Sequence, residues 1–461
     1  MNETVSPARQ SAFEILRRVA VEDAYAGPLL GSARYQSLSR EDHHLLHELT
    51  LGVLRRQGWL DFLIEHYAKR SITKLDLEVV IALRLGLYQL KVLTRIPAHA
   101  AINESVNLVR QAQKRSAVPF TNAILRAAQR DAESGESRLP ADPLHRLSIV
   151  TSTPLWLLRR WQKRWGLEET TALATECNLP PRAVFRYNER FSTREATDRW
   201  LSEHGVQTHP ATLVPEASII DEGGLGPESR PVREDWIYFQ EESSQLAARL
   251  ATPVEPNAAP RTVWDACAAP GGKSALIASL LPTGSRQVAT ELHSSRLQLM
   301  RELFRRQGIE EIRLVQADLT SPSPFAPESF DQIIVDAPCT GLGTIRKHPE
   351  IKWRCTPEKI AAMATLQRKI LETAAESLRP GGLLTYSVCS TEVEEGEEVI
   401  GWFRNRHPEY RDLTRERLIE LRLDPASLLT PTHGARTFPH QHHTEGFFIC
   451  VLWKRRPTEQ S

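Results

Sequence analysis

The chain has 461 residues, and this length predicts about three domains because one hydrophobic core rarely supports so many residues. Hydrophobic residues make up 41% and charged residues 25% of the sequence, which excludes a long disordered protein. Lys and Arg number 58 and Asp and Glu number 57, so any nucleic-acid-binding surface must be a local patch rather than a general basic character.

The six cysteines contain no C-x-x-C pair, which disfavours a structural zinc site and a disulfide framework. His440, His442 and His443 lack carboxylate or thiolate ligands at a suitable spacing, so we expect no metal. No apolar run approaches the roughly 18 residues of a membrane span, and the first residues do not resemble a signal peptide. We expect a cytoplasmic monomer with reduced cysteines and no membrane partner.

The first segment, residues 1–135, is predicted to be an all-α helical bundle. Apolar residues from Leu75 to Leu90 recur at spacings of three and four, which is the period of a helix with one buried face. Pro97 interrupts this pattern and is expected to lie in a turn between two helices. A polar stretch, residues 134–143, indicates a linker to a second segment, residues 144–235, where we expect a small α/β domain that binds RNA.

The third segment, residues 236–457, alternates short apolar strands with longer helical patterns. This alternation predicts a Rossmann-like parallel α/β sheet, in which ligands bind at the carboxyl ends of the strands. The five predicted strands are Thr262 to Cys267, Gln287 to Leu292, Ile312 to Asp318, Gln332 to Val335 and Leu383 to Val388. The residues at their ends are Asp265, Glu291, Asp318, Asp336 and Cys389.

A run of mostly small residues, Cys267-Ala268-Ala269-Pro270-Gly271-Gly272-Lys273, follows the first predicted strand and lets a ligand approach the backbone. The dinucleotide fingerprint and the Walker sequence are both absent, so a nucleoside without phosphate is expected, and S-adenosylmethionine fits. Glu291 is placed to bind the ribose hydroxyls, and Asp318 is placed to hold the adenine. The alternative is that each acid caps the helix that follows it.

Two cysteines, Cys339 and Cys389, follow neighbouring predicted strands and are expected to meet at the strand ends. A single buried cysteine is usually an apolar filler, and we keep that interpretation for Cys177, Cys355 and Cys450. Cytosine carbon 5 is a poor nucleophile until a thiolate adds to carbon 6. The pair therefore suits methylation of that carbon, with one cysteine as nucleophile, the other as the base that removes the carbon 5 proton, and Asp336 as an acid near ring nitrogen 3.

Residues 345–354 place several basic side chains beside a tryptophan, a combination that suits phosphates and a stacked base. The alternative for this stretch is a solvated charged loop. The predicted RNA-binding residues are Arg346, Lys347, His348, Lys352 and Trp353.

Taken together, these motifs resemble the NOL1/NOP2/Sun family of RNA cytosine-5 methyltransferases, and within it the bacterial Fmu/Sun ribosomal RNA enzymes. The residues before 136 resemble the helical, RNA-binding NusB domain that distinguishes those enzymes from relatives that act on tRNA. The NusB-like motifs are Leu83-Arg84-Leu85-Gly86-Leu87-Tyr88-Gln89 and Ile96-Pro97-Ala98-His99. The catalytic motifs are Gln240-Glu241-Glu242-Ser243-Ser244, Cys267 to Lys273, Asp336 to Cys339, His348 to Trp353, Cys389-Ser390-Thr391 and Arg436-Thr437-Phe438-Pro439.

The resemblance implies that Cys389 is the nucleophile and Cys339 the releasing cysteine, with a cytidine of 16S rRNA as the target. It also implies that S-adenosylmethionine is bound by the run Cys267 to Lys273 together with Glu291, Asp318 and Asp336. Two alternatives are a tRNA cytosine-5 methyltransferase, which the NusB-like segment disfavours, and a non-catalytic RNA-binding or ribosome assembly factor, which the two cysteines disfavour. The sequence departs from the family pattern at Glu291, Glu241, Thr340 and Gly396, where the family usually has Asp, Asp, Ser and Asn.

Overall fold

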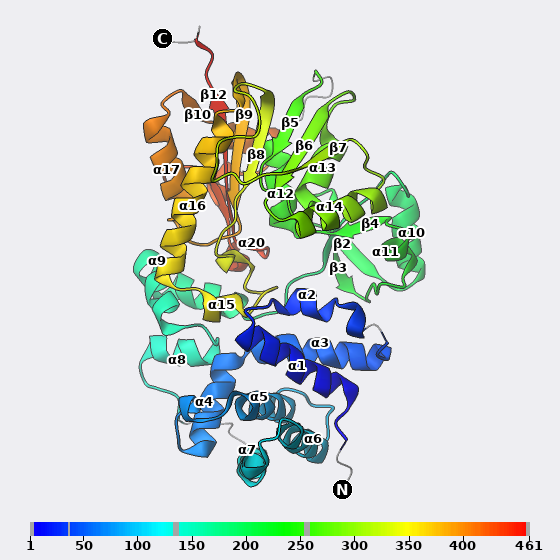
Figure 1. Ribbon diagram of the computed structural model, residues 1–461, viewed down its shortest axis with the longest axis vertical. Coiled ribbons are helices and arrows are strands. Elements are labelled where there is room, and N and C mark those ends of the chain that lie inside the picture. Colours follow the sequence, from blue (N-terminus) through cyan, green and yellow to red (C-terminus); the bar gives the residue numbers. More distant parts are fainter. Residues whose placement is uncertain (1–3, 36, 132–137, 253–258, 458–461) are drawn as a thin grey trace. The chain divides into compact units, whose positions relative to one another are not determined.

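The computed structural model describes residues 4–35, 37–131, 138–252 and 259–457, which form two compact units (Figure 1). Unit 1 comprises Met1–Pro180 together with Ile345–Arg354, and unit 2 comprises Pro181–Thr344 and Cys355–Ser461. The linker predicted at residues 134–143 begins among residues 132–137, which lie outside the described residues. Within the described ranges, no helix combines the length and the apolar character needed to cross a membrane.

The described residues of unit 1 form helices and no strands, as the periodicity predicts. Leu83 and Leu87 of α5 are fully buried in its core, and Leu75 and Leu90 pack against it. Pro97 directly precedes α6, so the predicted inter-helix turn is confirmed. The α-helices are α1 (Pro7–Val21), α2 (Ala26–Leu30), α3 (Arg40–Arg55), α4 (Gln57–Ala68), α5 (Leu77–Lys91), α6 (Ala98–Gln111), α7 (Val118–Arg130), α8 (Pro143–Val150), α9 (Leu155–Glu176) and α15 (Ile351–Arg354). Short 3-10 helices lie at Ala33–Tyr35, Ile72–Lys74 and Arg115–Ala117.

The segment Ile345–Arg354 joins unit 1 although its neighbours in the sequence belong to unit 2. Figure 1 shows its helix α15 among the helices of unit 1. The Lys352 Nζ atom donates hydrogen bonds to the Arg55 carbonyl at 3.1 Å and the Thr151 carbonyl at 3.2 Å. Arg346 forms an ion pair with Glu176 at 3.2 Å. A buried cation requires acceptors that replace water, and here those acceptors belong to unit 1. The contacts therefore hold the segment in unit 1.

The smaller sheet of unit 2 is antiparallel, with the strand order β2-β3-β1-β4. Figure 1 shows α10 and α11 beside this sheet, so the second segment has the expected small α/β fold. Helices α8 and α9, which were predicted to belong to that segment, pack into unit 1 instead. The elements are β1 (Val184–Tyr187), α10 (Arg194–Glu203), β2 (Gln207–Pro210), β3 (Ala217–Glu222), α11 (Arg230–Arg233) and β4 (Ile237–Phe239).

The larger sheet of unit 2 has the order β10-β12-β9-β8-β5-β6-β7, with β11 paired to β12. Strands β5 to β9 are mutually parallel and correspond to the five predicted strands, whereas β10, β11 and β12 are antiparallel additions. The strands are β5 (Thr262–Asp265), β6 (Arg286–Glu291), β7 (Ile312–Gln316), β8 (Phe330–Asp336), β9 (Leu378–Val388), β10 (Tyr410–Asp412), β11 (Ala435–Thr437) and β12 (Phe447–Lys454).

Helices cover the larger sheet, and Figure 1 shows α16 and α17 together at one side of it. Trp264, Tyr386 and Phe403 are fully buried in the resulting core. Burial of such side chains contributes most of the stability because each removes a large apolar area from water. The helices are α12 (Glu242–Ala251), α13 (Gly272–Leu280), α14 (Ser294–Arg306), α16 (Pro357–Ala375), α17 (Glu397–Arg406), α18 (Thr414–Glu420), α19 (Pro425–Leu428) and α20 (Pro439–His442), with a 3-10 turn at Leu342–Thr344.

Burial lowers the pKa of Lys352 from 10.5 to about 7, and this shift predicts a pH-dependent stability. The unfolded chain holds this proton more tightly than the folded chain, so the destabilising effect is complete below pH 7 and fades as the pH approaches 10.5. In urea unfolding, the free energy of unfolding of the wild type relative to Lys352→Met should therefore rise by about 1 kcal/mol per pH unit above neutrality.

Lys369→Met is the matched control because Lys369 is exposed on α16, and its stability difference from the wild type should not change with pH. Parallel pH curves for the wild type and Lys352→Met would show that Lys352 keeps an ordinary pKa in the folded chain.

Candidate active site

The loop between β5 and α13 has the shape that its small residues predict. Gly271 adopts a φ of 104°, in the left-handed region that favours glycine, and its N–H donates to the Ala268 carbonyl at 2.8 Å. The Ala268 N–H donates to the Thr290 carbonyl at 3.0 Å, which ties the loop to β6. A Cβ atom at Gly271 would lie 3.0 Å from the Phe304 ring. The loop is therefore fixed close to the end of the sheet.

Three acids lie at or after the ends of β5, β6 and β7. Asp265 is buried and accepts a hydrogen bond from Ser274 Oγ at 2.6 Å, and burial raises the pKa of its carboxyl to about 6. One oxygen of Glu291 accepts the His293 N–H at 3.0 Å. One oxygen of Asp318 accepts the N–H and hydroxyl of Thr320 at 2.9 and 2.7 Å. Glu291 and Asp318 thus bind the turn that follows each strand, and their contacts with ribose and adenine stay predictions.

Asp336, at the end of β8, is held by two side chains. Lys273 Nζ forms an ion pair with one carboxylate oxygen at 2.7 Å, and Ser387 Oγ donates to the other at 2.7 Å. Burial lowers the pKa of Lys273, but the neighbouring Asp336 outweighs burial and the net pKa is raised. The lysine therefore remains charged. Lys273 is therefore a second candidate donor beside Asp336, and the role of Asp336 as an acid stays a prediction.

The Cys339 and Cys389 sulfur atoms lie 3.2 Å apart. The structure thus brings together the two cysteines that were expected to meet at the strand ends. The hydrogen bond with Cys389 and burial raise the pKa of Cys339 well above its ordinary value. Cys389 in turn contributes to the raised pKa of Lys273, so the ammonium and this sulfur lie within electrostatic range of each other.

The backbone of the loop after Cys339 lies so close to the backbone at Cys389 and Gly446 that no side chain fits between them. The Gly343 N–H donates to the Cys389 carbonyl at 3.0 Å, and the Gly446 N–H donates to the Gly343 carbonyl at 2.9 Å. A Cβ atom built on Gly343 would lie 1.8 Å from the Gly446 carbonyl oxygen. Only glycine fits here, because any side chain at position 343 would overlap backbone that cannot move aside.

A buried carboxylate that sequence reasoning missed lies beside the cysteines. Glu395 is fully buried in the turn between β9 and α17 and accepts hydrogen bonds from Thr340 and Ser390, the residues that follow the two cysteines. The sequence signal for it is weak, since Glu392-Val393-Glu394-Glu395 has the composition of a solvated acidic turn.

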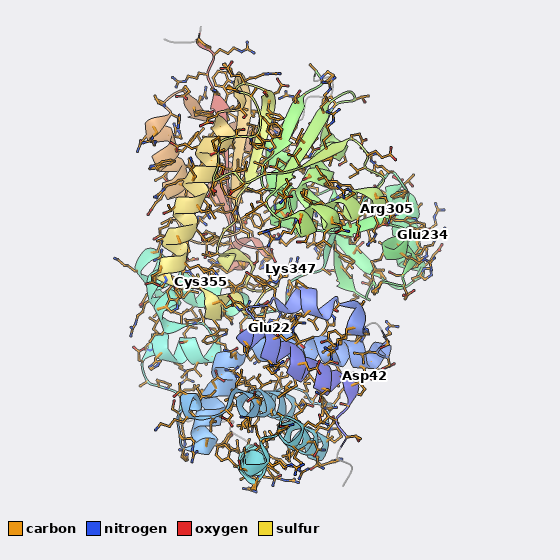
Figure 2. The ribbon with its side chains drawn as sticks, viewed as in Figure 1. Glu22, Asp42, Glu234, Arg305, Lys347 and Cys355 are labelled. Carbon is orange, nitrogen blue, oxygen red and sulfur yellow. The ribbon has the colours of Figure 1, made fainter. Side chains whose placement is uncertain are left out.

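Residues 345–354 were predicted to bind RNA, with a solvated charged loop as the alternative, and the structure buries two of the predicted RNA-binding side chains. Arg346 is 4% exposed and Lys352 is 1% exposed, because both are bound to carbonyl or carboxylate oxygens of unit 1. His348 is partly buried, and burial lowers its pKa to about 4. Lys347 and Trp353 are the exposed members of the predicted set, and Figure 2 labels Lys347 and also Cys355, where the chain returns to unit 2. No group of three or more His, Cys, Asp or Glu residues suited to a metal occurs in the described part of the chain.

Three protein families match this chain. The 16S rRNA methyltransferase RsmB/F family matches residues 251–453, the NusB family matches residues 6–130, and the ferredoxin-like domain of RsmF/B-like methyltransferases matches residues 153–224. The fold class predicted from the sequence is therefore confirmed, with a helical NusB-like part, a small α/β part and a Rossmann-like methyltransferase part.

Relatives of known name match over nearly the whole chain. The probable ribosomal RNA small subunit methyltransferase B of Bacillus subtilis (strain 168) is 32% identical over 97% of this chain and 98% of its own. The ribosomal RNA small subunit methyltransferase B of Pseudomonas syringae pv. tomato is 33% identical over 95% of this chain and 96% of its own.

Solved structures agree in fold. The crystal structure of PH0851 superposes with a TM-score of 0.78 at 24% identity, covering 98% of this chain and all of the other. NSun6 from Pyrococcus horikoshii with SFG superposes with a TM-score of 0.55 at 22% identity, covering 66% of this chain and 98% of the other. The cofactor prediction of S-adenosylmethionine agrees with the matching family, because its members are methyltransferases. From these matches and the geometry above, the chain belongs to the RsmB/F family of 16S rRNA methyltransferases.

Proposed function

We propose that this chain methylates carbon 5 of a cytidine in 16S rRNA, with Cys389 as the nucleophile and Cys339 as the base that releases the product. The observation that carries this proposal is the 3.2 Å contact between two cysteine sulfur atoms beside the Lys273–Asp336 ion pair. Two thiols in contact serve a reaction that needs both a nucleophile and a nearby base, which a single buried cysteine does not provide.

The raised pKa of Cys339 supports this division of roles. The contact with Cys389 and burial hold the pKa of Cys339 well above its ordinary value, so the Cys339 thiol can donate its proton in a hydrogen bond to the Cys389 sulfur. A thiolate at Cys389 would also lie within electrostatic range of the Lys273 ammonium. Cys389 is therefore the sulfur that attacks carbon 6 of the ring, forming a carbon–sulfur bond that makes carbon 5 nucleophilic.

The release step follows from the same hydrogen bond. Once Cys389 is bonded to carbon, its sulfur is neutral and no longer accepts a strong hydrogen bond from Cys339. The largest cause of the raised pKa of Cys339 is then removed, and this thiol can ionise. Its thiolate takes the proton from carbon 5, the electron pair re-forms the ring double bond, and the Cys389 thiolate leaves.

The Lys273–Asp336 pair is the acid in this scheme. Addition of a thiolate to carbon 6 places negative charge on the ring, and a donor near nitrogen 3 offsets it. Lys273 carries the proton, while Asp336 orients it and is itself oriented by Ser387. The sequence hypothesis that assigned this role to Asp336 alone is thus extended to a pair.

The residues at the ends of β5, β6 and β7 fit S-adenosylmethionine by their chemistry. Carboxylates at Asp265, Glu291 and Asp318 suit the ammonium and hydroxyl donors of that molecule, and the Cys267 to Gly272 loop presents backbone rather than bulky side chains. When bound, S-adenosylmethionine supplies the methyl group that carbon 5 receives.

The relatives and the NusB match support ribosomal RNA as the target class, since the relatives are named as ribosomal RNA small subunit methyltransferases. Parallel assays on 16S rRNA and on tRNA, with bisulfite sequencing to find the methylated cytidine, test this choice. Methylation of tRNA alone would contradict it.

The two cysteine variants should fail differently because they act in successive steps. Cys389→Ala should lower methylation by at least about 10³-fold, the scale of losing a nucleophile, because no adduct forms. Cys339→Ala should instead accumulate protein covalently bound to RNA, visible as a slow band on a denaturing gel, because the adduct forms but does not collapse.

Two controls interpret these variants. The Cys339→Ala, Cys389→Ala double variant should show no slow band, and calorimetry should find S-adenosylmethionine affinity within about threefold of the wild type in all three, since neither thiol is needed to hold a nucleoside. If Cys389→Ala is the variant that traps RNA, the two roles are reversed.

We further propose that Lys347 contacts RNA phosphates, because it is the exposed cation of the predicted RNA-binding segment. Lys347→Ala should weaken RNA binding and reduce the slope of log affinity against log salt by about one, the effect of one lost phosphate contact. Lys369→Ala makes the same charge change on the exposed side of α16 and should leave the slope unchanged. Equal slopes for both variants would remove Lys347 from the RNA-binding surface.

A further inference from the structure

Glu395 is a buried carboxylate whose two oxygens are both fully engaged in hydrogen bonds. Its side chain is fully buried, and both of its carboxylate oxygens accept two hydrogen bonds each. Oε1 accepts from the Thr340 N–H at 2.8 Å and from Gln367 Nε2 at 3.0 Å. Oε2 accepts from Thr340 Oγ1 at 2.5 Å and from Ser390 Oγ at 2.5 Å. Burial raises the pKa of Glu395, and these four hydrogen bonds, which favour the ionised carboxylate, oppose that rise.

The donors to Glu395 lie next to the two cysteines in the sequence or in contact with the residue before one of them. Thr340 directly follows Cys339 on the loop after β8, and Ser390 directly follows Cys389 at the end of β9. Gln367, on α16, also donates to the carbonyl of Pro338, the residue before Cys339, at 2.9 Å. One carboxylate therefore binds the backbone or side chain adjacent to both cysteines.

The backbone of Glu395 is bound to the sheet. The Tyr386 hydroxyl donates to the Glu395 carbonyl at 2.6 Å, and Tyr386 is a fully buried residue of β9. This bond ties the residue whose carboxylate contacts both cysteine loops to β9. Without Glu395, the Thr340 and Ser390 hydroxyls and the Thr340 N–H would be buried donors in need of new partners, and each donor left unsatisfied would destabilise this arrangement.

We propose that Glu395 is a positioning residue that keeps the Cys339 and Cys389 sulfur atoms in contact by binding the residue after each of them. Its significance for catalysis rests on the proposed function, in which the two thiols act in turn, but the positioning itself is a property of the folded chain. The negative charge of Glu395 also contributes to the raised pKa of Cys339. Glu395 thus acts on the reaction through the cysteines and not by touching the base.

Two substitutions separate hydrogen bonding from charge. In Glu395→Gln the amide oxygen can accept from the Thr340 N–H and Gln367, while the amide nitrogen donates to the two hydroxyls, which can turn and accept. All four contacts survive and only the charge is lost. In Glu395→Ala all four contacts are lost.

The test measures thiol proximity directly with phenylarsine oxide. This trivalent arsenical forms two arsenic–sulfur bonds with a pair of adjacent thiols and releases one water, and it binds a single thiol far more weakly because the second bond is then lost. Its dissociation constant can be measured by competition with a small dithiol, with Cys339→Ala as the single-thiol baseline. No RNA or methyl donor is required, so the result does not depend on the proposed reaction.

Glu395→Ala should weaken phenylarsine oxide binding by at least about tenfold toward the Cys339→Ala baseline, whereas Glu395→Gln should stay within about threefold of the wild type. Glu398→Ala is the matched control, because Glu398 is an exposed acid three residues further along, and its arsenical affinity should equal that of the wild type. S-adenosylmethionine affinity, measured on the same samples, shows that each variant retains a folded methyltransferase domain.

If Glu395→Ala does not fold, the combined Thr340→Val, Ser390→Ala variant removes both hydroxyl contacts and keeps the carboxylate, and it should also weaken arsenical binding by about tenfold. Wild-type arsenical affinity in a folded Glu395→Ala or in this combined variant would overturn the positioning role. Loss of methylation in Glu395→Gln with intact arsenical affinity would leave the positioning role standing and place the importance of Glu395 in its charge.

Discussion

The parallel pairing of β8 with β9, in the register that sets Asp336 opposite Ser387, is the constraint on which the site depends. This register lets Ser387 Oγ bind the Asp336 carboxylate and the Ala337 N–H bind the Ser387 carbonyl at 2.9 Å. It also starts the two cysteine loops side by side, so the sulfur atoms meet at 3.2 Å. A shift of one residue would turn every side chain of one strand to the other face of the sheet. The ion pair and the thiol contact would then both be lost.

The antiparallel strand β12 completes the site from the other side. Its pairing with β9 places Gly446, just before the strand, against Gly343 in the loop after Cys339. Glu241 supports the same turn, since one of its oxygens accepts the Glu445 N–H at 2.8 Å. Glu241 stands where the family usually has aspartate, and the longer side chain forms this contact with the turn. The C-terminal strand is part of the framework that holds the cysteines.

Another departure from the family pattern, Gly396, also has a structural explanation. A Cβ atom at this position would lie 2.8 Å from Arg436 Nη2 and 2.8 Å from the Phe448 ring. Arg436 is fixed there by an ion pair with Glu397 at 2.6 Å and by a hydrogen bond to the Ser390 carbonyl at 2.7 Å. In this chain the arginine occupies the space that a side chain at position 396 would need.

The sequence predicts those parts of the site that depend on local pattern. Short apolar runs identify the parallel strands, and the residues after them identify Asp336, Cys339 and Cys389, because the carboxyl ends of parallel strands share one edge. Contacts between distant residues are not encoded in this way. Lys352 and Arg346 are residues of the types usually exposed on a surface, yet both are buried. Lys352 donates to the carbonyls of Arg55 and Thr151, and Arg346 donates to the Pro180 carbonyl and pairs with Glu176.

Glu395 and Lys273 illustrate the same limit inside the site. An acidic run before a helix predicts solvent exposure, and only tertiary packing supplies the four donors that Glu395 binds when it is buried. Lys273 was predicted from its place in the cofactor loop, but its ion pair with Asp336 depends on the adjacency of β5 and β8. Local sequence identifies the candidate groups, and long-range packing decides which of them lie in contact.

The central claim is that Cys389 forms the covalent bond to cytosine. RNA containing 5-fluorocytidine tests it most directly, because fluorine at carbon 5 cannot be removed as a proton and the adduct on the wild-type enzyme does not collapse. Digestion of the trapped complex and mass spectrometry then identify the modified peptide. We expect a methylated 5-fluorocytidine attached to Cys389. Attachment to Cys339, or methylation without any covalent adduct, would contradict it.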